Sequence, residues 1–259
     1  MIDPLTRFSN RSENYAKFRP GYPAAVIEIL KSDCGLTPAS VIADVGSGTG
    51  ILSELLLRNG NSVFAVEPNA AMRQVAEATL STYPNFTNVD ATAEATTLDT
   101  AGVDFVTAAQ AFHWFDRAKA KREFARILRP GGWVVLIWNE RRLDSSKFLR
   151  AYEDLLLRYG TDYEKVRHER VNEEIAEFYS PETFAMKAFA NVQRLDFQSL
   201  KGRLLSSSYA PELGQPNFPA MLERLKEIFE ENQKDGTIDF EYDAKVFYGQ
   251  LHLPQLPSS

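Results

Sequence analysis

The sequence is poor in the residues that form cross-links and metal sites: it has one cysteine, Cys34, and three histidines in 259 residues. A single cysteine excludes an internal disulfide. Three scattered histidines and one cysteine do not give the spacing of a metal-ligand set, so we expect no metal. The longest apolar run, residues 133–138, is far shorter than the roughly 20 residues of a membrane-spanning helix. The first residues contain no apolar stretch of signal-peptide length, and we expect a cytoplasmic protein without a membrane partner.

A strong charge of one sign is also absent. The chain has 29 basic and 35 acidic residues, and no block of like charge is long enough to suggest a nucleic-acid surface. Apolar residues make up 44% of the chain, which is enough for a substantial core and excludes disorder as the main state. We therefore expect chemistry on a small molecule and no nucleic-acid partner. The sequence does not predict the oligomeric state.

We expect one domain over residues 1–259 with three parts that differ in composition and hydrophobic pattern. Residues 1–36 mix aromatic and charged side chains and form an N-terminal lid segment, with a helix over 24–30 that begins after Pro23. Residues 37–140 alternate short apolar runs with helical patterns. Residues 141–259 supply the remaining strands and helical insertions that are expected to cap the site.

The alternation in residues 37–140 indicates an α/β fold. Short runs rich in β-branched and aromatic residues are typical of strands, and helices between strands imply parallel pairing with helices on both faces. Strands are predicted over 41–45, 62–66, 86–89, 103–107 and 133–137, and helices over 51–59, 70–81 and 118–128. The last third adds helices over 146–159, 172–179 and 220–233, strands over 192–197 and 237–247, and a turn at 235–236. The prediction is a doubly wound, mostly parallel, seven-stranded sheet.

A glycine-rich turn follows the first predicted strand, in the stretch Asp44-Val45-Gly46-Ser47-Gly48-Thr49-Gly50. Ligands of open parallel sheets bind beyond the carboxyl ends of the strands, and glycines there let a ligand approach the main chain. A dinucleotide fingerprint has the form G-x-G-x-x-G, but Ile51 occupies the place of its third glycine. The spacing therefore weakens a nicotinamide-dependent oxidoreductase as an alternative. A tight structural turn would also need glycine.

An acidic residue, Glu67, ends the second predicted strand, 17 residues after Gly50. A carboxylate at this position can accept hydrogen bonds from both hydroxyls of a ribose. The alternative is a solvated carboxylate near a helix start. The glycine turn and the acid together favour a nucleoside-containing ligand.

Five sequence elements occur in a set order along the chain. They are Asp44-x-Gly46-x-Gly48-x-Gly50, Glu67 with Pro68 and Met72, Ala93-Glu94, Gln110-Ala111-Phe112-His113-Trp114-Phe115, and Leu128-Arg129-Pro130-Gly131-Gly132. Together they resemble the class I methyltransferases that use S-adenosylmethionine, in particular the small-molecule branch near the trans-aconitate and ubiquinone-type methyltransferases. The resemblance covers about residues 15–139 and is vague beyond Arg141.

The resemblance implies S-adenosylmethionine as the cofactor and assigns a role to each matching residue. The three glycines would pack against its methionine and ribose portion, and Glu67 would hold the ribose hydroxyls. The other cofactor contacts that it implies are Pro68, Met72, Ala93 and Glu94 at the adenine, and Asp44 and Gln110 near the amino group. In the N-terminal segment Tyr15, Arg19 and Tyr22 are in a cluster that would fold over the cofactor, with Arg19 near a carboxylate of the cofactor or of an anionic acceptor and Tyr22 at the acceptor.

The aromatic run that follows the fourth strand should lie near the reacting methyl group. Aromatic faces attract cations such as a sulfonium, so Phe112, His113 and Trp114 are predicted to contact the acceptor or the methyl donor. His113 could take a proton from the acceptor as a general base or only shape the pocket, and Trp114 is a second candidate for a catalytic role. For Phe112 the alternative is packing in the core.

The predicted function is methyl transfer from S-adenosylmethionine to an oxygen, carbon or nitrogen atom of a small acceptor by direct displacement, without a covalent enzyme intermediate. A module that binds S-adenosylmethionine or S-adenosylhomocysteine without catalysis is the main alternative, because one fold hosts many functions. A nicotinamide-dependent oxidoreductase is less consistent with the glycine spacing.

Overall fold

The computed structural model describes residues 17–161, 163, 171–207 and 209–251. The chain divides into two compact units. We call Tyr22–Trp138, Arg170–Phe189 and Ala244–Ser259 the sheet unit, and Met1–Gly21, Asn139–Glu169 and Ala190–Asp243 the helical unit. The single domain and its three parts remain a prediction beside this division.

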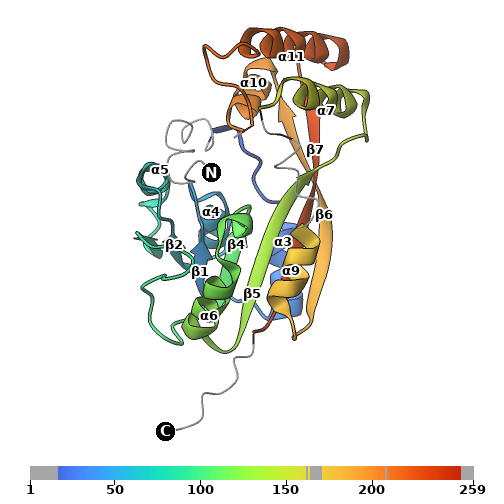
Figure 1. Ribbon diagram of the computed structural model, residues 1–259. Coiled ribbons are helices and arrows are strands. Elements are labelled where there is room, and N and C mark those ends of the chain that lie inside the picture. Colours follow the sequence, from blue (N-terminus) through green and yellow to red (C-terminus); the bar gives the residue numbers. More distant parts are fainter. Residues whose placement is uncertain (1–16, 162, 164–170, 208, 252–259) are drawn as a thin grey trace. The chain divides into compact units, whose positions relative to one another are not determined.

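Seven strands form one sheet in the order β3-β2-β1-β4-β5-β7-β6 (Figure 1). The pairs β1 with β2, β1 with β4, β2 with β3 and β4 with β5 are parallel. Because the chain leaves β1 toward β3 and then returns to its other side with β4, the switch point of the topology lies at β1. The bounds are β1 Val41–Val45, β2 Ser62–Val66, β3 Phe86–Val89, β4 Val103–Ala109, β5 Leu128–Arg141, β6 Phe184–Leu195 and β7 Ile238–Gly249. The predicted seven-stranded, mostly parallel sheet is confirmed.

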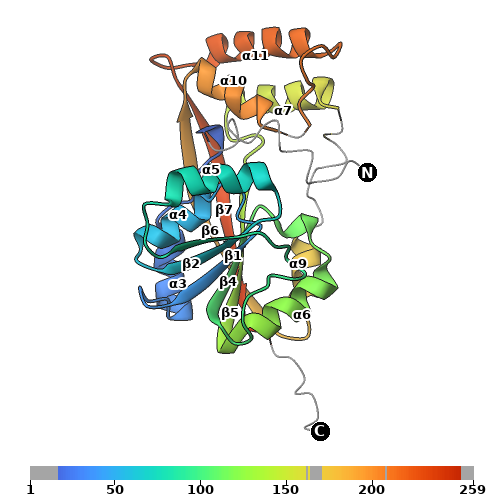
Figure 2. The same cartoon turned by 90° about the vertical axis from the view of Figure 1, so that its left-hand side faces the viewer.

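Helices cover both faces of the sheet unit, and Figure 2 shows α3 and α4 on one side with α6 and α9 on the other. Alternate residues of a strand point to opposite faces, so Ile42 packs in the layer of α3 and α4, whereas Ala43 packs in the layer of α6 and α9. Both residues are fully buried. The helices of this unit are α3 Ala25–Cys34, α4 Ile51–Arg58, α5 Ala70–Leu80, the 3₁₀ turn η2 Phe112–Trp114, α6 Arg117–Ile127 and α9 Val171–Tyr179.

Three helices of the helical unit pack around their own apolar core. Phe148 and Leu156 of α7 meet Leu225 of α11, Leu200 of α10 and Phe240 of β7 in a cluster separate from the two layers of the sheet unit. The helices are α7 Lys147–Tyr159, α10 Phe197–Leu205 and α11 Phe218–Asn232. The prediction that these insertions cap the site remains a prediction.

Side-chain caps explain where several helices begin. Asn69 accepts hydrogen bonds from the main-chain N–H groups of Ala71 and Met72 at the start of α5, and Asp116 accepts one from Lys119 at the start of α6. Such caps satisfy N–H groups that have no partner within the helix. Ser146 and Asp196 cap α7 and α10 in the same way.

Three sequence expectations differ from the structure. The strand expected over 133–137 is β5, which spans Leu128–Arg141 and takes Leu128 from the helix expected over 118–128. The strand expected over 192–197 is β6, which ends at Leu195 and begins eight residues earlier than expected, at Phe184. Helix α10 was not expected, and its start at Phe197 follows from Asp196, whose carboxylate accepts a hydrogen bond from the N–H of Ser199 at 2.7 Å. The turn at 235–236 is confirmed, since both residues have positive φ and an antiparallel bridge joins Lys234 to Thr237.

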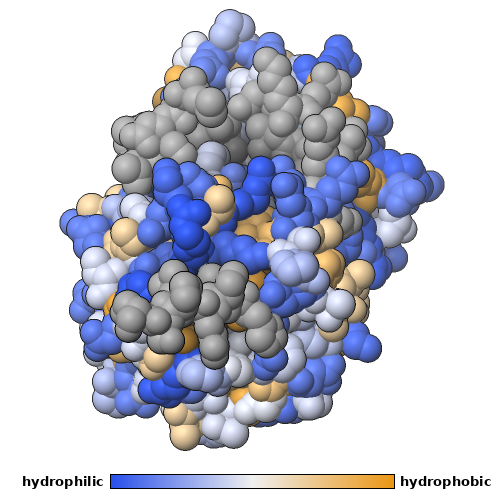
Figure 3. Space-filling model, turned by 60° about the horizontal axis from the view of Figure 1, so that its bottom comes forward, coloured by the Kyte–Doolittle hydropathy of each residue, from blue (hydrophilic) through white to orange (hydrophobic). Residues whose placement is uncertain are grey.

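The surface view in Figure 3 presents mainly hydrophilic side chains with hydrophobic ones interspersed. Among the described residues, every helix is too short or too polar to cross a membrane.

Candidate functional site

The loop after β1 turns sharply back under the end of β2. The N–H groups of Gly46 and Ser47 both donate to the carbonyl of Val66, at 2.8 and 3.2 Å. Gly46, Gly48 and Gly50 have φ values of 67°, 57° and 85°, a left-handed conformation that only glycine adopts without strain. The carboxyl ends of β1 and β2 are aligned, because Val45 is paired with Val66.

The three glycines of this loop differ in what surrounds them. A Cβ on Gly46 would lie 2.5 Å from the Cβ of Ala111, and one on Gly50 would lie 2.5 Å from Cδ1 of Leu80. A Cβ on Gly48 would meet nothing within 4 Å. Packing against the fold therefore accounts for Gly46 and Gly50, whereas Gly48 has open space beside it.

Asp44 lies at the end of β1, directly before the glycine loop, and its side chain contacts two neighbouring elements. Its side chain is buried, and its two carboxylate oxygens accept hydrogen bonds from the hydroxyls of Ser53 on α4 at 2.6 Å and Thr107 on β4 at 2.9 Å. Burial raises the pKa of Asp44 from 3.8 to about 6, and the charge of Glu67 adds to that rise, while the two hydroxyls oppose it. These contacts join the end of β1, directly before the glycine loop, to α4 and β4.

The raised pKa of Asp44 predicts a pH-dependent stability. A carboxyl whose pKa is higher in the folded state binds protons there more tightly, so stability falls as pH rises from about 4 to about 6 and then levels off. The loss from this group is about 3 kcal/mol. Urea unfolding of the wild type and of Asp44→Asn across this pH range should show that the variant lacks this part of the fall. An identical pH dependence in both proteins would contradict the assignment.

Glu67 joins the second strand end to the glycine loop. Its Oε2 accepts a hydrogen bond from the N–H of Gly48 at 3.0 Å, and its Oε1 accepts one from the N–H of Asn69 at 2.8 Å. Burial raises the pKa of Glu67, opposed by these two hydrogen bonds and by the charge of Arg73. Each carboxylate oxygen has two lone pairs, so both retain acceptor capacity for further hydroxyl groups.

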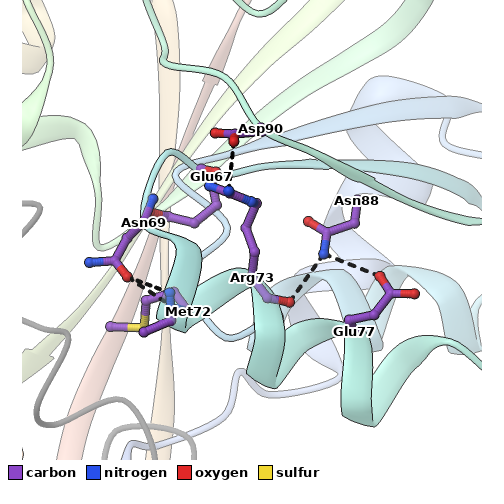
Figure 4. A network of polar contacts seen from close by, with 8 residues as sticks. Glu67, Asn69, Met72, Arg73, Glu77, Asn88 and Asp90 are labelled. Atoms are coloured by element: carbon purple, nitrogen blue, oxygen red, sulfur yellow. Dashed lines mark hydrogen bonds and ion pairs between the residues drawn. The ribbon is translucent and has the colours of Figure 1, made fainter.

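Arg73 on α5 holds the same corner. Figure 4 shows its guanidinium between Glu67 and Asp90, which follow β2 and β3. Its Nη1 donates to the carbonyl oxygen of Glu67 at 2.8 Å and its Nη2 to Oδ2 of Asp90 at 2.7 Å. Asn88 donates to the carbonyl oxygen of Arg73 at 3.1 Å, which ties α5 to β3. The backbone that carries Glu67 is thus fixed by side-chain contacts from two elements.

The fourth strand ends in an unusual backbone conformation. Gln110 has a φ of 54°, although it is not glycine, and its N–H donates to the carbonyl of Ile137 at 3.0 Å. Residues held in this region are strained by about 1 kcal/mol or more and often lie at functional sites. The left-handed conformation of Gln110 turns the chain at the carboxyl end of β4, which lies between β1 and β5 in the sheet.

The aromatic run after Gln110 divides into buried and exposed rings. Phe112 is buried and makes an edge contact with Phe178 at a centroid distance of 5.0 Å, which favours the packing role. The His113 ring lies 4.5 Å from that of Trp114 and 5.3 Å from that of Trp138. Trp114 is 38% exposed. Trp114 is therefore the most exposed ring of the run, and His113 and Phe115 are half-buried.

The remaining predicted residues have varied positions. Met72 and Ala93 are buried, Pro68 and Tyr22 are half-buried, and the Glu94 carboxylate accepts a hydrogen bond from the N–H of Asp116 at 2.8 Å. Arg19, in the helical unit, donates to the carbonyl of Ser206 at 3.0 Å. Tyr15 lies outside the described residues.

Sequence reasoning missed the residues that hold the site residues in place. Ser53 and Thr107 contact Asp44 from 9 and 63 positions away, and Arg73 reaches Asp90 across 17 positions. Among these supporting residues, Asn69 could have been found from the sequence, because an Asn directly before a predicted helix is a typical N-cap.

Part of the sequence is similar to methyltransferases of other organisms, and the structure is similar to solved methyltransferase structures. It is 42% identical over 141 residues to an uncharacterized methyltransferase of Mycobacterium tuberculosis, covering 54% of each chain. It is 32% identical over 138 residues to an uncharacterized methyltransferase of Schizosaccharomyces pombe, covering 52% of this chain and 53% of the other. The matched parts span about half the length of these relatives. The structure of a candidate type II methyltransferase from Anaeromyxobacter dehalogenans superposes with a TM-score of 0.63 at 24% identity, covering 91% of this chain and 100% of the other.

The order of the seven strands, the glycine loop after β1 and the acid after β2 agree with the resemblance to class I methyltransferases, and the solved methyltransferase structure shares the fold. Residues 43–136 match the family model described as the methyltransferase domain.

Proposed function

We propose that the chain is an S-adenosylmethionine-dependent methyltransferase that acts on a small-molecule acceptor. The observation that carries the proposal is the hydrogen bond of 3.0 Å from the N–H of Gly48 to the Glu67 carboxylate, beside the open space at Gly48. A nucleoside needs an acceptor for its ribose hydroxyls and a main chain without side chains to pack against, and these two residues supply both at adjacent strand ends.

The residues of the sheet unit fit this cofactor. Glu67 has acceptor capacity left for the two ribose hydroxyls, and Gly48 leaves room for the portion next to them. Pro68 and Met72 would contact the adenine, with Ala93 and Glu94 at its edge. Asp44 would act mainly by orienting the loop, and the carbonyl groups near Gln110 would hold the amino group. We assign Arg19 and Tyr15 to the carboxylate only by resemblance.

The chemistry that S-adenosylmethionine supplies is an activated methyl group on a sulfonium. The protein's part is then to align an acceptor atom with that group and to exclude water, because no further activation of the donor is needed. His113 and Trp114 present aromatic faces that favour a cation nearby, and His113 is also the one candidate among the site residues for a general base. Tyr22 completes the proposed acceptor contacts, and the buried Phe112, the other predicted contact, would support His113 and Trp114 from within the core without touching the acceptor.

Transfer of an isotope-labelled methyl group tests the function. The purified full-length chain is incubated with methyl-labelled S-adenosylmethionine and a mixture of small metabolites extracted from cells, and the products are separated by chromatography. We expect label in at least one small molecule and none with Glu67→Ala, while Glu28→Ala, a change on the exposed side of α3, behaves as the wild type. Cofactor binding without any label transfer would favour the non-catalytic binding module instead.

A further inference from the structure

The helical unit contains a cluster of three arginines and four tyrosines, and apart from Arg19 the proposed cofactor site does not use them. We call it the arginine cluster. Its charged members differ in burial: Arg203 is 5% exposed, the Arg141 side chain is 10% exposed, and Arg19 is half-buried. The tyrosines around them are Tyr152, Tyr163, Tyr209 and Tyr242, and all seven residues belong to this unit.

Arg203 is a buried cation whose partners are neutral. Its Nε donates to the hydroxyl of Tyr242 at 3.0 Å and its Nη1 to the hydroxyl of Ser207 at 3.1 Å, and the guanidinium lies 5.5 Å from the ring centre of Phe240. Within the described part of the chain, no carboxylate lies within ion-pair distance of Arg203. Burying a cation without an opposite charge is costly, so this position favours a negative charge from outside.

One terminal nitrogen of the Arg141 guanidinium is paired and the other is not. Its Nη2 forms a short ion pair with Glu153 and donates to the hydroxyl of Tyr163 at 2.7 Å. Its Nη1 is shielded from solvent and has no hydrogen-bond partner, and the same holds for the hydroxyl of Tyr152, over whose ring the guanidinium lies. Buried polar groups are nearly always paired, so two such donors on residues in contact with each other point to a missing acceptor.

The two most buried arginines of the cluster differ in their charge partners. Among the described residues Glu153 pairs with Arg141, whereas no carboxylate offsets the charge of Arg203. The pKa of Tyr209 reflects the nearby cations. Burial alone would raise its pKa, but the charges of Arg203, Arg19 and Arg141 and a hydrogen bond with Ser207 outweigh burial and lower the pKa.

We propose that the arginine cluster binds a small organic anion through its carboxylate groups. The spare Nη1 of Arg141 and the hydroxyl of Tyr152 donate to the carboxylate, and the charge of Arg203 compensates it. Planar guanidinium groups match the geometry of a carboxylate, and the charge of Arg203, which no described carboxylate offsets, suits a second carboxylate on the same ligand. Arg19 and Tyr209 are half-buried and leave the edge of the cluster partly exposed. The inference concerns the helical unit alone and does not depend on methyl transfer.

Anion-dependent melting of the full-length chain without cofactor tests this site. Formate, succinate and inorganic phosphate are compared with chloride at equal ionic strength, and succinate affinity is then measured by calorimetry. We expect formate and succinate to raise Tm, since a ligand that binds only the folded state stabilises it. Dimethyl succinate, which has the same skeleton without charge, should leave Tm unchanged.

Three variants separate binding from folding. Tyr152→Phe removes only the unpartnered hydroxyl and should weaken succinate binding about fivefold, and Arg141→Gln should weaken it at least about tenfold. Arg142→Gln is the matched control, because Arg142 pairs with Asp243 and is not part of the cluster, and it should bind as the wild type. The proposal is overturned if no carboxylate raises Tm, if phosphate binds more tightly than succinate, or if Tyr152→Phe and Arg141→Gln bind succinate as the wild type does.

Discussion

Replacing Glu67 by alanine is expected to weaken the binding of S-adenosylmethionine about 100-fold or more. Hydrogen bonds to a charged group contribute about 1.5–3 kcal/mol each, and the Glu67 carboxylate is proposed to accept two from the ribose. The variant also loses the hydrogen bonds from the N–H groups of Gly48 and Asn69, which adds a modest loss of stability. Titration calorimetry measures the affinity, and circular dichroism shows whether the fold is kept.

The control for this change is Glu28→Ala, since Glu28 is exposed on α3 and pairs only with Lys31 at 3.1 Å among the contacts described. It should leave the affinity unchanged. A Glu67→Ala protein that is folded and binds S-adenosylmethionine as tightly as the wild type would remove the ribose assignment. Glu67→Gln keeps the shape of the side chain but not its charge, so its affinity for S-adenosylmethionine should lie between those of the wild type and of Glu67→Ala.

The second large effect is expected from alanine at Gly48, compared with alanine at Gly46. Both positions have positive φ, which costs alanine about 1–2 kcal/mol. The new methyl at Gly48 meets no protein atom but fills the space proposed for the cofactor, so affinity should fall at least about tenfold with a small loss of stability. At Gly46 the new methyl overlaps the Cβ of Ala111, and unfolding free energy should fall by about 3 kcal/mol or more.

Urea unfolding and calorimetry on both variants distinguish the two roles of the loop. We expect Gly48→Ala to unfold at a higher urea concentration than Gly46→Ala. We also expect Gly48→Ala to lose more affinity for S-adenosylmethionine than its small loss of stability would explain. If Gly48→Ala binds S-adenosylmethionine with wild-type affinity, the open side of Gly48 does not face the cofactor.

Much of the sheet unit was predictable because its signals are local. The strands at 41–45, 62–66 and 86–89 match the structure residue for residue, since short buried runs of parallel strands end at clear breaks such as Gly46 and Pro68. The helices at 51–58 and 70–80 end one residue earlier than expected. The order of glycine loop and acid along the chain was enough to place both at the same edge of the sheet.

The parts that the sequence did not predict depend on long-range contacts or on competing local patterns. The strand pattern before residue 197 hid the start of α10, although Asp196 is a typical cap. The arginine cluster joins segments as far apart as Arg19, Arg141 and Arg203, which no periodicity connects. In the same way, Gly46 and Gly50 look like ligand contacts in the sequence, and only the structure reveals Ala111 and Leu80 beside them.

Calorimetric titration of the purified chain with S-adenosylmethionine, S-adenosylhomocysteine and NAD, side by side, tests the central claim most directly. The account predicts micromolar binding of the two sulfur nucleosides and none of NAD, because Glu67 and the glycine loop suit a nucleoside whereas Ile51 stands where a dinucleotide fingerprint needs glycine. Binding of NAD alone, or of none of the three, would contradict the assignment of the site.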